Sequence, residues 1–159
     1  MLTFSDILQR IKENNYLVTN LMAEGDVDEI QNNMTDEEFE RLGRDVAHNT
    51  HLNEVHLTQG ALNDNKMSSL FRGLTRSNSI KDMNLNFNGL GVEGVGSMVP
   101  FLQNANNLLE LHLDYNNIQS EGFNPCSTLV VVPSLASPLN VKRQARIFLG
   151  MLLSSSTQT

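Results

Sequence analysis

The sequence has a single cysteine and no apolar run long enough to cross a bilayer. Cys126 alone cannot build an internal disulfide framework, which agrees with a reducing compartment. The longest apolar runs, at 129–132 and 147–153, fall far below the roughly 20 residues that a membrane-spanning helix needs. Asp6 and Arg10 interrupt the segment where a secretory signal requires unbroken apolar residues. We therefore expect an intracellular, cytoplasmic protein that does not enter a membrane.

The chain also lacks the signatures of catalysis and of nucleic-acid binding. It has no G-x-S-x-G, H-E-x-x-H or Walker loop, and Cys126 has no histidine near it in sequence. Bases are scarce at the front, since residues 1–54 carry twelve acidic side chains against four basic ones, within a net charge of −7. Such an acidic surface is a poor electrostatic match for nucleic acid. We expect neither an enzyme, nor a cofactor, nor a small-molecule substrate.

What the sequence does contain is a repeat. Three segments share the pattern apolar-x-x-apolar-x-apolar-x-x-Asn-x-apolar and begin 28 residues apart, at Leu52, Ile80 and Leu108, although the first has glycine in place of the asparagine. A strand-period core followed by a turn and a helix cannot bury its apolar edge alone, so such units must stack. We expect Asn88 and Asn116 to hydrogen-bond backbone groups in the turns, where an unpaired group would cost about 1 to 3 kcal/mol.

Helical segments recur in phase with these strands. Thr35 and Glu38 form a capping-box signature at the start of the first segment. The apolar positions of the three helices match one another at 28-residue intervals: Phe39, Leu42 and Val46; Met67, Leu70 and Leu74; Val95, Met98 and Leu102.

The chain before the repeats predicts a helical N-terminal cap. Apolar residues within 4–24 are spaced for one helix face, and Asn14-Asn15 is a place where this helix could break in two. A degenerate first repeat begins at Val27, 25 residues before Leu52. We predict strands at 28–31, 53–57, 82–86 and 109–113. The division that follows is a cap at 1–26, repeats at 27–123 (27–51 degenerate, 52–79, 80–107, 108–123 truncated) and a divergent tail at 124–159.

The tail loses the repeat after Phe123. It contains two prolines that bracket 133–138, a serine-rich end and no acidic residue. We predict that 124–159 is loosely ordered. The competing hypothesis is that 128–132 and 141–153 fold back and cover the last repeat as a C-terminal cap.

These repeats resemble the ribonuclease-inhibitor type of leucine-rich repeat, through the LxxLxLxxN/GxL pattern followed by a helix at a 28-residue period. The opening, a helix before the degenerate repeat at Val27 and then the segment 37–42 (EEFERL), also resembles the leucine-rich-repeat domain of tropomodulins and leiomodins. The resemblance implies an α/β leucine-rich-repeat solenoid, with a parallel sheet on its concave face and helices on its convex face.

A glycine-rich segment offers a different interpretation. Gly89, Gly91 and Gly94 match the G-x-G-x-x-G dinucleotide fingerprint, and Asp114 follows about 20 residues later. The same positions in the next unit, 117–122, lack the first two glycines, so the segment is better explained as a repeat turn. We expect these glycines to shorten the third helix and Ser97 to be its first secure cap.

The residues between the strand leucines point to the concave face, because side chains alternate along a strand. One interpretation is a solvated acidic face without a ligand. The other is a docking surface for a basic or amphipathic segment of a protein partner, anchored on an aromatic pair. In register, the side chains form four columns: Glu54, Asp82 and Glu110; His56, Asn84 and His112; Thr58, Asn86 and Asp114; Gln59, Phe87 and Tyr115.

His56 and His112 do not predict a shared metal site. They lie two strands apart, roughly 9 to 10 Å, with Asn84 between them.

The function predicted from the sequence is a non-enzymatic protein-interaction module or scaffold. Two alternatives stay open: a regulatory domain like those of Ran GTPase-activating proteins, which this repeat type also resembles, or a fragment of a longer solenoid.

Overall fold

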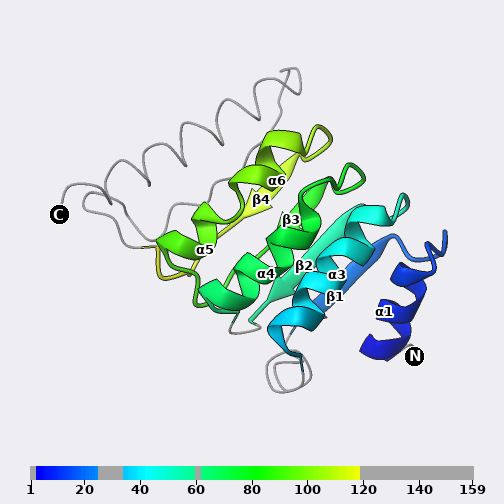
Figure 1. Ribbon diagram of the computed structural model, residues 1–159, viewed down its shortest axis with the longest axis horizontal. Coiled ribbons are helices and arrows are strands. Elements are labelled where there is room, and N and C mark those ends of the chain that lie inside the picture. The colour runs from blue at the N-terminus through cyan, green and yellow to red at the C-terminus, as the bar shows by residue number, and fades with distance from the viewer. Residues whose placement is uncertain (1–2, 25–33, 60–61, 119–159) are drawn as a thin grey trace.

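The computed structural model describes residues 3–24, 34–59 and 62–118. Strands and helices alternate along this part of the chain (Figure 1). In chain order, the elements are α1 (Phe4–Lys12), β1 (Asn20–Glu24), α3 (Asp36–His48), β2 (Glu54–Thr58), α4 (Asp64–Leu74), β3 (Asp82–Asn84), α5 (Val92–Gly96), α6 (Val99–Asn104) and β4 (Glu110–His112).

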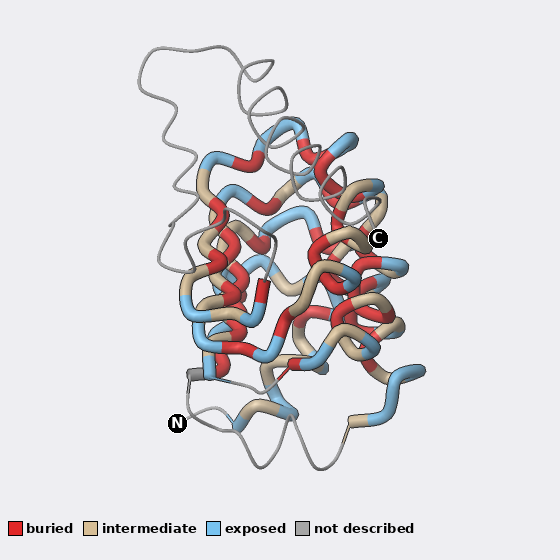
Figure 2. Tube along the Cα trace, turned by 90° about the vertical axis from the view of Figure 1, so that its left-hand side faces the viewer, coloured by how far each residue is buried: buried red, intermediate tan, exposed pale blue. Residues whose placement is uncertain are grey.

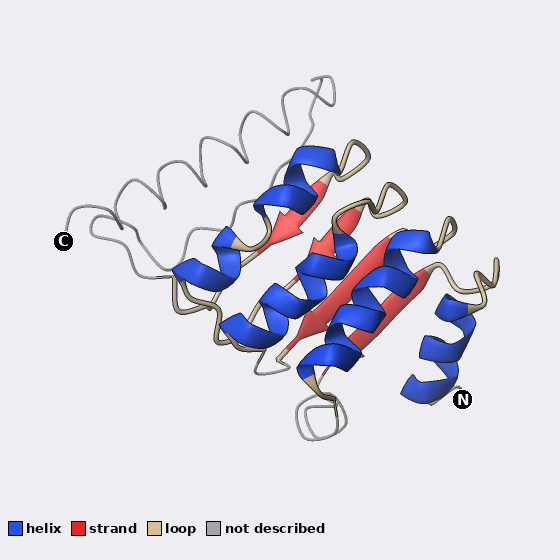
Figure 3. Ribbon diagram, in the orientation of Figure 1, coloured by secondary structure: helices blue, strands red, loops and turns tan. Residues whose placement is uncertain are grey.

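The strands form one parallel four-stranded sheet in the order β1-β2-β3-β4, and the helices cover one of its faces (Figure 3). Burial alternates along β2, whose Val55 and Leu57 face the helices and are fully buried. Figure 2 shows the same alternation of buried and more exposed positions along the sheet. The apolar core therefore lies between the two layers, and none of the described helices lies on the other face of the sheet.

The predicted strands at 53–57, 82–86 and 109–113 are confirmed to within two residues at each end. Their predicted register is also confirmed, because Val55 pairs with Met83 and Met83 with Leu111. The fold class is α/β with a parallel sheet, as the period indicates. The predicted strand at 28–31 lies outside the described residues.

The predicted helix over 4–24 is wrong in its second half. The helix α1 ends at Lys12, Asn14 takes a left-handed conformation with φ of 51°, and the chain then enters β1. Leu21 pairs with Val55, so the first strand lies 34 residues before the second rather than 25. The first repeat is therefore longer than the others.

Capping side chains define the starts of α1, α3 and α4. The Thr35 hydroxyl accepts from the backbone N–H of Glu38, and the Glu38 carboxylate accepts from the backbone N–H of Thr35, which confirms the predicted capping box. Thr3 and Asp6 form the same box at α1, where the backbone N–H of Thr3 is the main group that lowers the pKa of Asp6.

The helices α3 and α4 approach one another through two glycines. A Cβ atom at Gly43 would overlap the carbonyl oxygen of Leu70, and one at Gly73 would overlap the carbonyl oxygen of Glu40. Backbone contact is possible only because both positions lack a side chain. The apolar rows predicted on these two helices are buried: Phe39, Leu42, Val46, Met67, Leu70 and Leu74.

The third helical segment is split, and the predicted cap at Ser97 is wrong. Ser97 ends α5 instead of starting a helix, and its hydroxyl donates to the carbonyl oxygen of Gly94. Pro100 stands in the first turn of α6, where its missing N–H costs no hydrogen bond. No helix in the described parts of the chain is long and apolar enough to cross a membrane.

Candidate functional site

Two asparagines fix the turns that follow β3 and β4. The Asn88 side-chain amide donates to the carbonyl oxygens of Leu57 and Leu85, and its Oδ1 accepts from the backbone N–H of Leu62. Asn116 repeats this arrangement one unit later, with Leu85 as one of its acceptors. Each asparagine therefore joins its own turn to the previous repeat, which confirms the role expected for both residues.

The glycine-rich turn also serves repeat packing. The backbone N–H of Gly91 donates to Oδ1 of Asp64 at 2.7 Å, and a Cβ atom at Gly94 would collide with the same carboxylate. The carboxylate thus stands against the turn where the fingerprint would require a phosphate. This geometry favours the repeat interpretation over dinucleotide binding.

The face of the sheet that no described helix covers carries the predicted polar columns. We call it the open face and define it by the partly exposed side chains Glu54, His56, Asp82, Asn84, Glu110 and His112. Glu54 pairs with Asp82 and Asp82 with Glu110, so the predicted carboxylate column exists. The backbone places these residues side by side because the repeats share one register.

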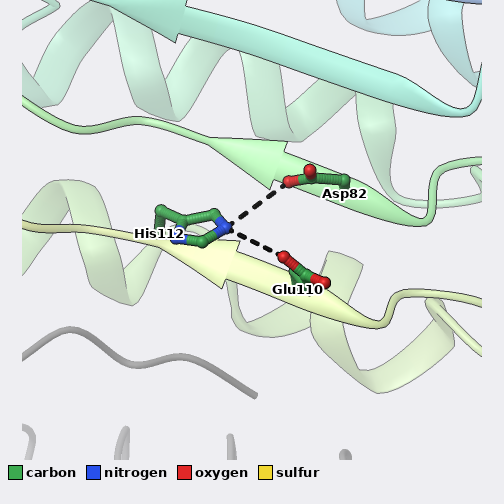
Figure 4. Close-up of side chains that lie close together, drawn as sticks. All are labelled: Asp82, Glu110 and His112. Carbon is green, nitrogen blue, oxygen red and sulfur yellow. Dashed lines mark hydrogen bonds and ion pairs between the residues drawn. The ribbon is translucent and has the colours of Figure 1, made fainter. Parts of the chain in front are cut away.

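Histidines reach diagonally into the carboxylate column. The Nε2 atom of His112 lies 3.3 Å from Oε2 of Glu110 and 3.7 Å from Oδ1 of Asp82. Figure 4 shows this imidazole directed toward both carboxylates. On the other side, Nε2 of His56 lies 3.4 Å from Oδ2 of Asp82. The columns are therefore linked, and Asp82 stands at the centre of the cluster.

The asparagines of the second and third predicted columns shape the turns through hydrogen bonds. The strand β3 ends at Asn84, and the Asn84 side chain accepts from the backbone N–H of Asn86. The Asn86 side chain in turn accepts from the backbone N–H of Asp114 at 2.6 Å. Thr58 ends β2 and is partly exposed. Asn84 and Asn86 thus have structural hydrogen bonds that account for them without a partner.

An aromatic pair projects beside the open face. The rings of Phe87 and Tyr115 stack with centroids 4.3 Å apart and planes 6° from parallel, although 47% and 61% of these residues are exposed. Gln59, Phe87 and Tyr115 all take the left-handed conformation, with φ of 55° to 56°. That conformation costs a non-glycine residue roughly 1 to 2 kcal/mol. The turn geometry recurs in each repeat, but the exposed aromatic stack does not follow from it.

Met22 extends the open face onto the first strand. It pairs with His56 and is 44% exposed, in line with the column of His56, Asn84 and His112. The sequence reasoning missed it because 4–24 was assigned to a helix. The signal was present, since Val18, Leu21 and Ala23 have the spacing of the repeat, with alanine in place of the last leucine.

A groove of about 250 Å³ lies elsewhere, between α1 and α3. Its walls mix apolar residues such as Leu8 with charges of both signs, including Lys12 and Asp45. No aromatic ring is among the described residues that line it. The open face is the better candidate because charges and aromatic rings converge on it.

Comparison with known proteins places the fold. No known family model matches the sequence, and no curated protein sequence matches it. A solved structure of leiomodin-1 actin-binding site 2 is similar, with a TM-score of 0.61 and 18% identity over 98% of this chain and 75% of that chain. A tropomodulin C-terminal domain from Caenorhabditis elegans has a TM-score of 0.63 and 18% identity, over 97% of this chain and 93% of that chain. The chain therefore has the fold of tropomodulin and leiomodin leucine-rich-repeat domains, as its opening segments indicate.

Proposed function

We propose that this chain is a non-enzymatic module that binds a protein partner on the open face and the aromatic pair. The observation that carries the proposal is the stack of Phe87 on Tyr115, which leaves two large rings exposed beside a column of carboxylates. Exposed aromatic side chains with few rotamers are common anchors of protein interfaces. The fold shared with a leiomodin site that is described as actin-binding supports a protein as the partner.

The chemistry of the open face favours a partner segment that is basic or amphipathic. Glu54, Asp82 and Glu110 align across three strands. The side chains within ion-pair distance of Asp82 and Glu110 are histidines. Lysine or arginine from a partner would reduce the repulsion within the column and steer the encounter. An apolar side chain of the same segment would cover the rings of Phe87 and Tyr115.

We also propose that the array is a short solenoid of the ribonuclease-inhibitor type, with the open face on its concave side. The predicted division into a cap at 1–26, repeats at 27–123 and a tail at 124–159 stays a prediction. The position of β1 favours moving the first boundary toward Val18, which occupies the place of Leu52 in the next repeat.

An affinity capture from native extract tests the proposal. The bait is the wild-type chain beside the double variant Asp82→Lys/Glu110→Lys, which reverses two charges of the open face. A second double variant, Glu37→Lys/Glu93→Lys, makes the same charge change at exposed positions of the helical layer. Purified actin is the first defined probe, since leiomodin's site is described as binding it.

Proteins retained by the wild type and by the helical-layer control, but lost from the open-face variant, are the partners that we expect. Circular dichroism of each bait excludes misfolding as the cause of a loss. Retention of every captured protein by the open-face variant would show that the partner binds elsewhere.

A further inference from the structure

We propose that Asp82, Glu110 and His112 form a binding site for one divalent transition-metal ion, with zinc as the best match. This inference does not depend on the proposed protein partner, because the three ligands belong to this chain. The sequence predicts no metal site, and this proposal departs from that prediction; the pair that the sequence argument excluded, His56 and His112, is not the one used here. The trio becomes visible only when the diagonal contacts between β3 and β4 are known.

The distances in the trio suit a tetrahedral ion. One ligand atom from each side chain can be chosen so that all three lie within 4.8 Å of one another. His112 Nε2 stands 3.3 Å from Glu110 Oε2 and 3.7 Å from Asp82 Oδ1. Ligand atoms that are each about 2.1 Å from a tetrahedral zinc ion lie about 3.4 Å from one another. Small side-chain rotations would therefore bring all three atoms into coordination.

An unsatisfied carboxylate oxygen is a separate sign that a ligand belongs here. Asp82 Oδ1 exposes less than 1 Å² and has no hydrogen-bond partner. The nearby His112 Nε2 can donate at most one proton, and its hydrogen bond goes to Glu110. Because a buried acceptor without a hydrogen-bond partner costs free energy, a further positive group beside Asp82 Oδ1 would stabilise this arrangement. A cation between the three side chains would satisfy both carboxylates and the imidazole together.

His56 is placed to orient Asp82. Its Nε2 atom lies 3.4 Å from Oδ2, the carboxylate oxygen that the proposed ion does not use, and it too is buried without a hydrogen bond. A hydrogen bond from a group behind a metal-binding carboxylate fixes the direction of the ligand. A small rotation would let His56 make that bond to Asp82, and water completes the coordination.

The ligand types favour zinc over the alkaline-earth ions. An imidazole nitrogen with two carboxylates suits zinc and related transition metals, whereas calcium takes six to eight oxygen ligands and magnesium prefers oxygen and water. The carboxylate column also favours a doubly charged ion at its centre. Each ion pair recorded for Asp82 and Glu110 in the described residues is made with a histidine, and none with lysine or arginine.

Metal titration of the full chain tests the site. The chain is treated with a chelator, dialysed, and titrated with Zn²⁺ by calorimetry and with Co²⁺ by visible absorption, which reports the coordination geometry. The ligand variants are made in a Cys126→Ser background, and the wild-type chain is titrated beside that background, because the Cys126 thiolate is a further strong zinc ligand in the sequence. We expect one equivalent of zinc, a tetrahedral cobalt spectrum, and a rise in melting temperature with zinc but not with magnesium.

Ligand variants distinguish this trio from other histidines. Glu110→Gln and His112→Asn should each weaken zinc binding at least about tenfold, while His51→Asn, which changes an exposed histidine outside the open face, should leave it unchanged. Glu110 is the most exposed of the three ligands, so its variant should fold even if His112→Asn does not. Absence of zinc binding, or equal affinity in Glu110→Gln and His51→Asn, would overturn the proposal. Loss of binding on Cys126→Ser alone would do the same.

Discussion

Asn88 shows how one side chain can connect two repeats. It is buried, and its side-chain amide bonds four backbone groups, at Leu57, Leu62, Leu85 and Asn86. The repeated pattern predicts this role because an asparagine recurs where the chain must turn. The same turn holds Phe87 in its left-handed conformation. A structural residue thus supports the part of the molecule that we propose binds a partner.

Asn88→Ala should lower the free energy of unfolding by about 1 to 3 kcal/mol, because it leaves buried backbone groups unpaired. The control is Asn104→Ala, since Asn104 is exposed and, among the described residues, its side chain bonds only to the carbonyl oxygen of Pro100 in its own helix. Chemical denaturation of both variants gives the comparison. Equal stability losses would contradict the role assigned to Asn88.

Leu85→Ala tests the register of the repeats. Leu85 is fully buried in the centre of the array, so its truncation should lower the free energy of unfolding by about 2 to 5 kcal/mol. Leu109→Ala, at a half-exposed position beside β4, should cost much less. A thermal melt unchanged by Leu85→Ala would show that the register is wrong.

At the scale of single residues, the sequence predicts which strand residues share one face of the sheet. It does not predict which side chains contact one another between neighbouring strands. Strand alternation and a 28-residue period were sufficient to align Glu54, Asp82 and Glu110. The diagonal approach of His112 to Asp82 was missed, because side-chain rotamers rather than register decide it. The metal hypothesis depends on that contact.

The elements show where local pattern misleads. The segment 18–23 has the spacing of a strand, but Ala23 replaces the large apolar residue and α1 precedes it without a proline or glycine. The apolar residues of this segment therefore fit the spacing of a helix as well as that of a strand. Pairing with β2 makes the segment a strand. The predicted start of the third helix is wrong for a related reason, because Ser97 can cap the end of α5 as well as the start of a helix.

The close crossing of α3 and α4 predicts a change in the free energy of unfolding that is opposite in sign to the one that helix propensity predicts. Alanine is ordinarily better than glycine in a helix by about 1 kcal/mol. Gly73→Ala should instead lower the free energy of unfolding by about 1 to 3 kcal/mol, because the new Cβ would overlap the backbone of α3 at Glu40 and Arg44.

The control for this crossing is Gly89→Ala, where the nearest atom to a new Cβ is the carbonyl oxygen of Leu62 at an ordinary 3.7 Å. Its effect on the free energy of unfolding should stay within about 0.5 kcal/mol. Differential scanning calorimetry of both variants decides the matter. A higher melting temperature for Gly73→Ala than for the wild type would rule out the close approach.

The whole molecule follows from the repeat. A fixed period of strand and helix predicts a parallel sheet covered on one face, which is the arrangement found and the fold shared with the tropomodulin and leiomodin structures. The partner is harder to predict, because one fold can present many different surfaces. Here the acidic column and the exposed rings carry the functional inference, while the predicted tail at 124–159 lies outside the described residues.

Binding kinetics test the central claim, that the open face and aromatic pair receive a partner, most directly. A captured partner, or actin if it binds, is passed over the immobilised wild type, Asp82→Lys/Glu110→Lys and Tyr115→Ala. The charge reversal should slow association and reduce its dependence on salt, whereas Tyr115→Ala should mainly speed dissociation. Association and dissociation rates that are the same for all three chains would contradict the claim.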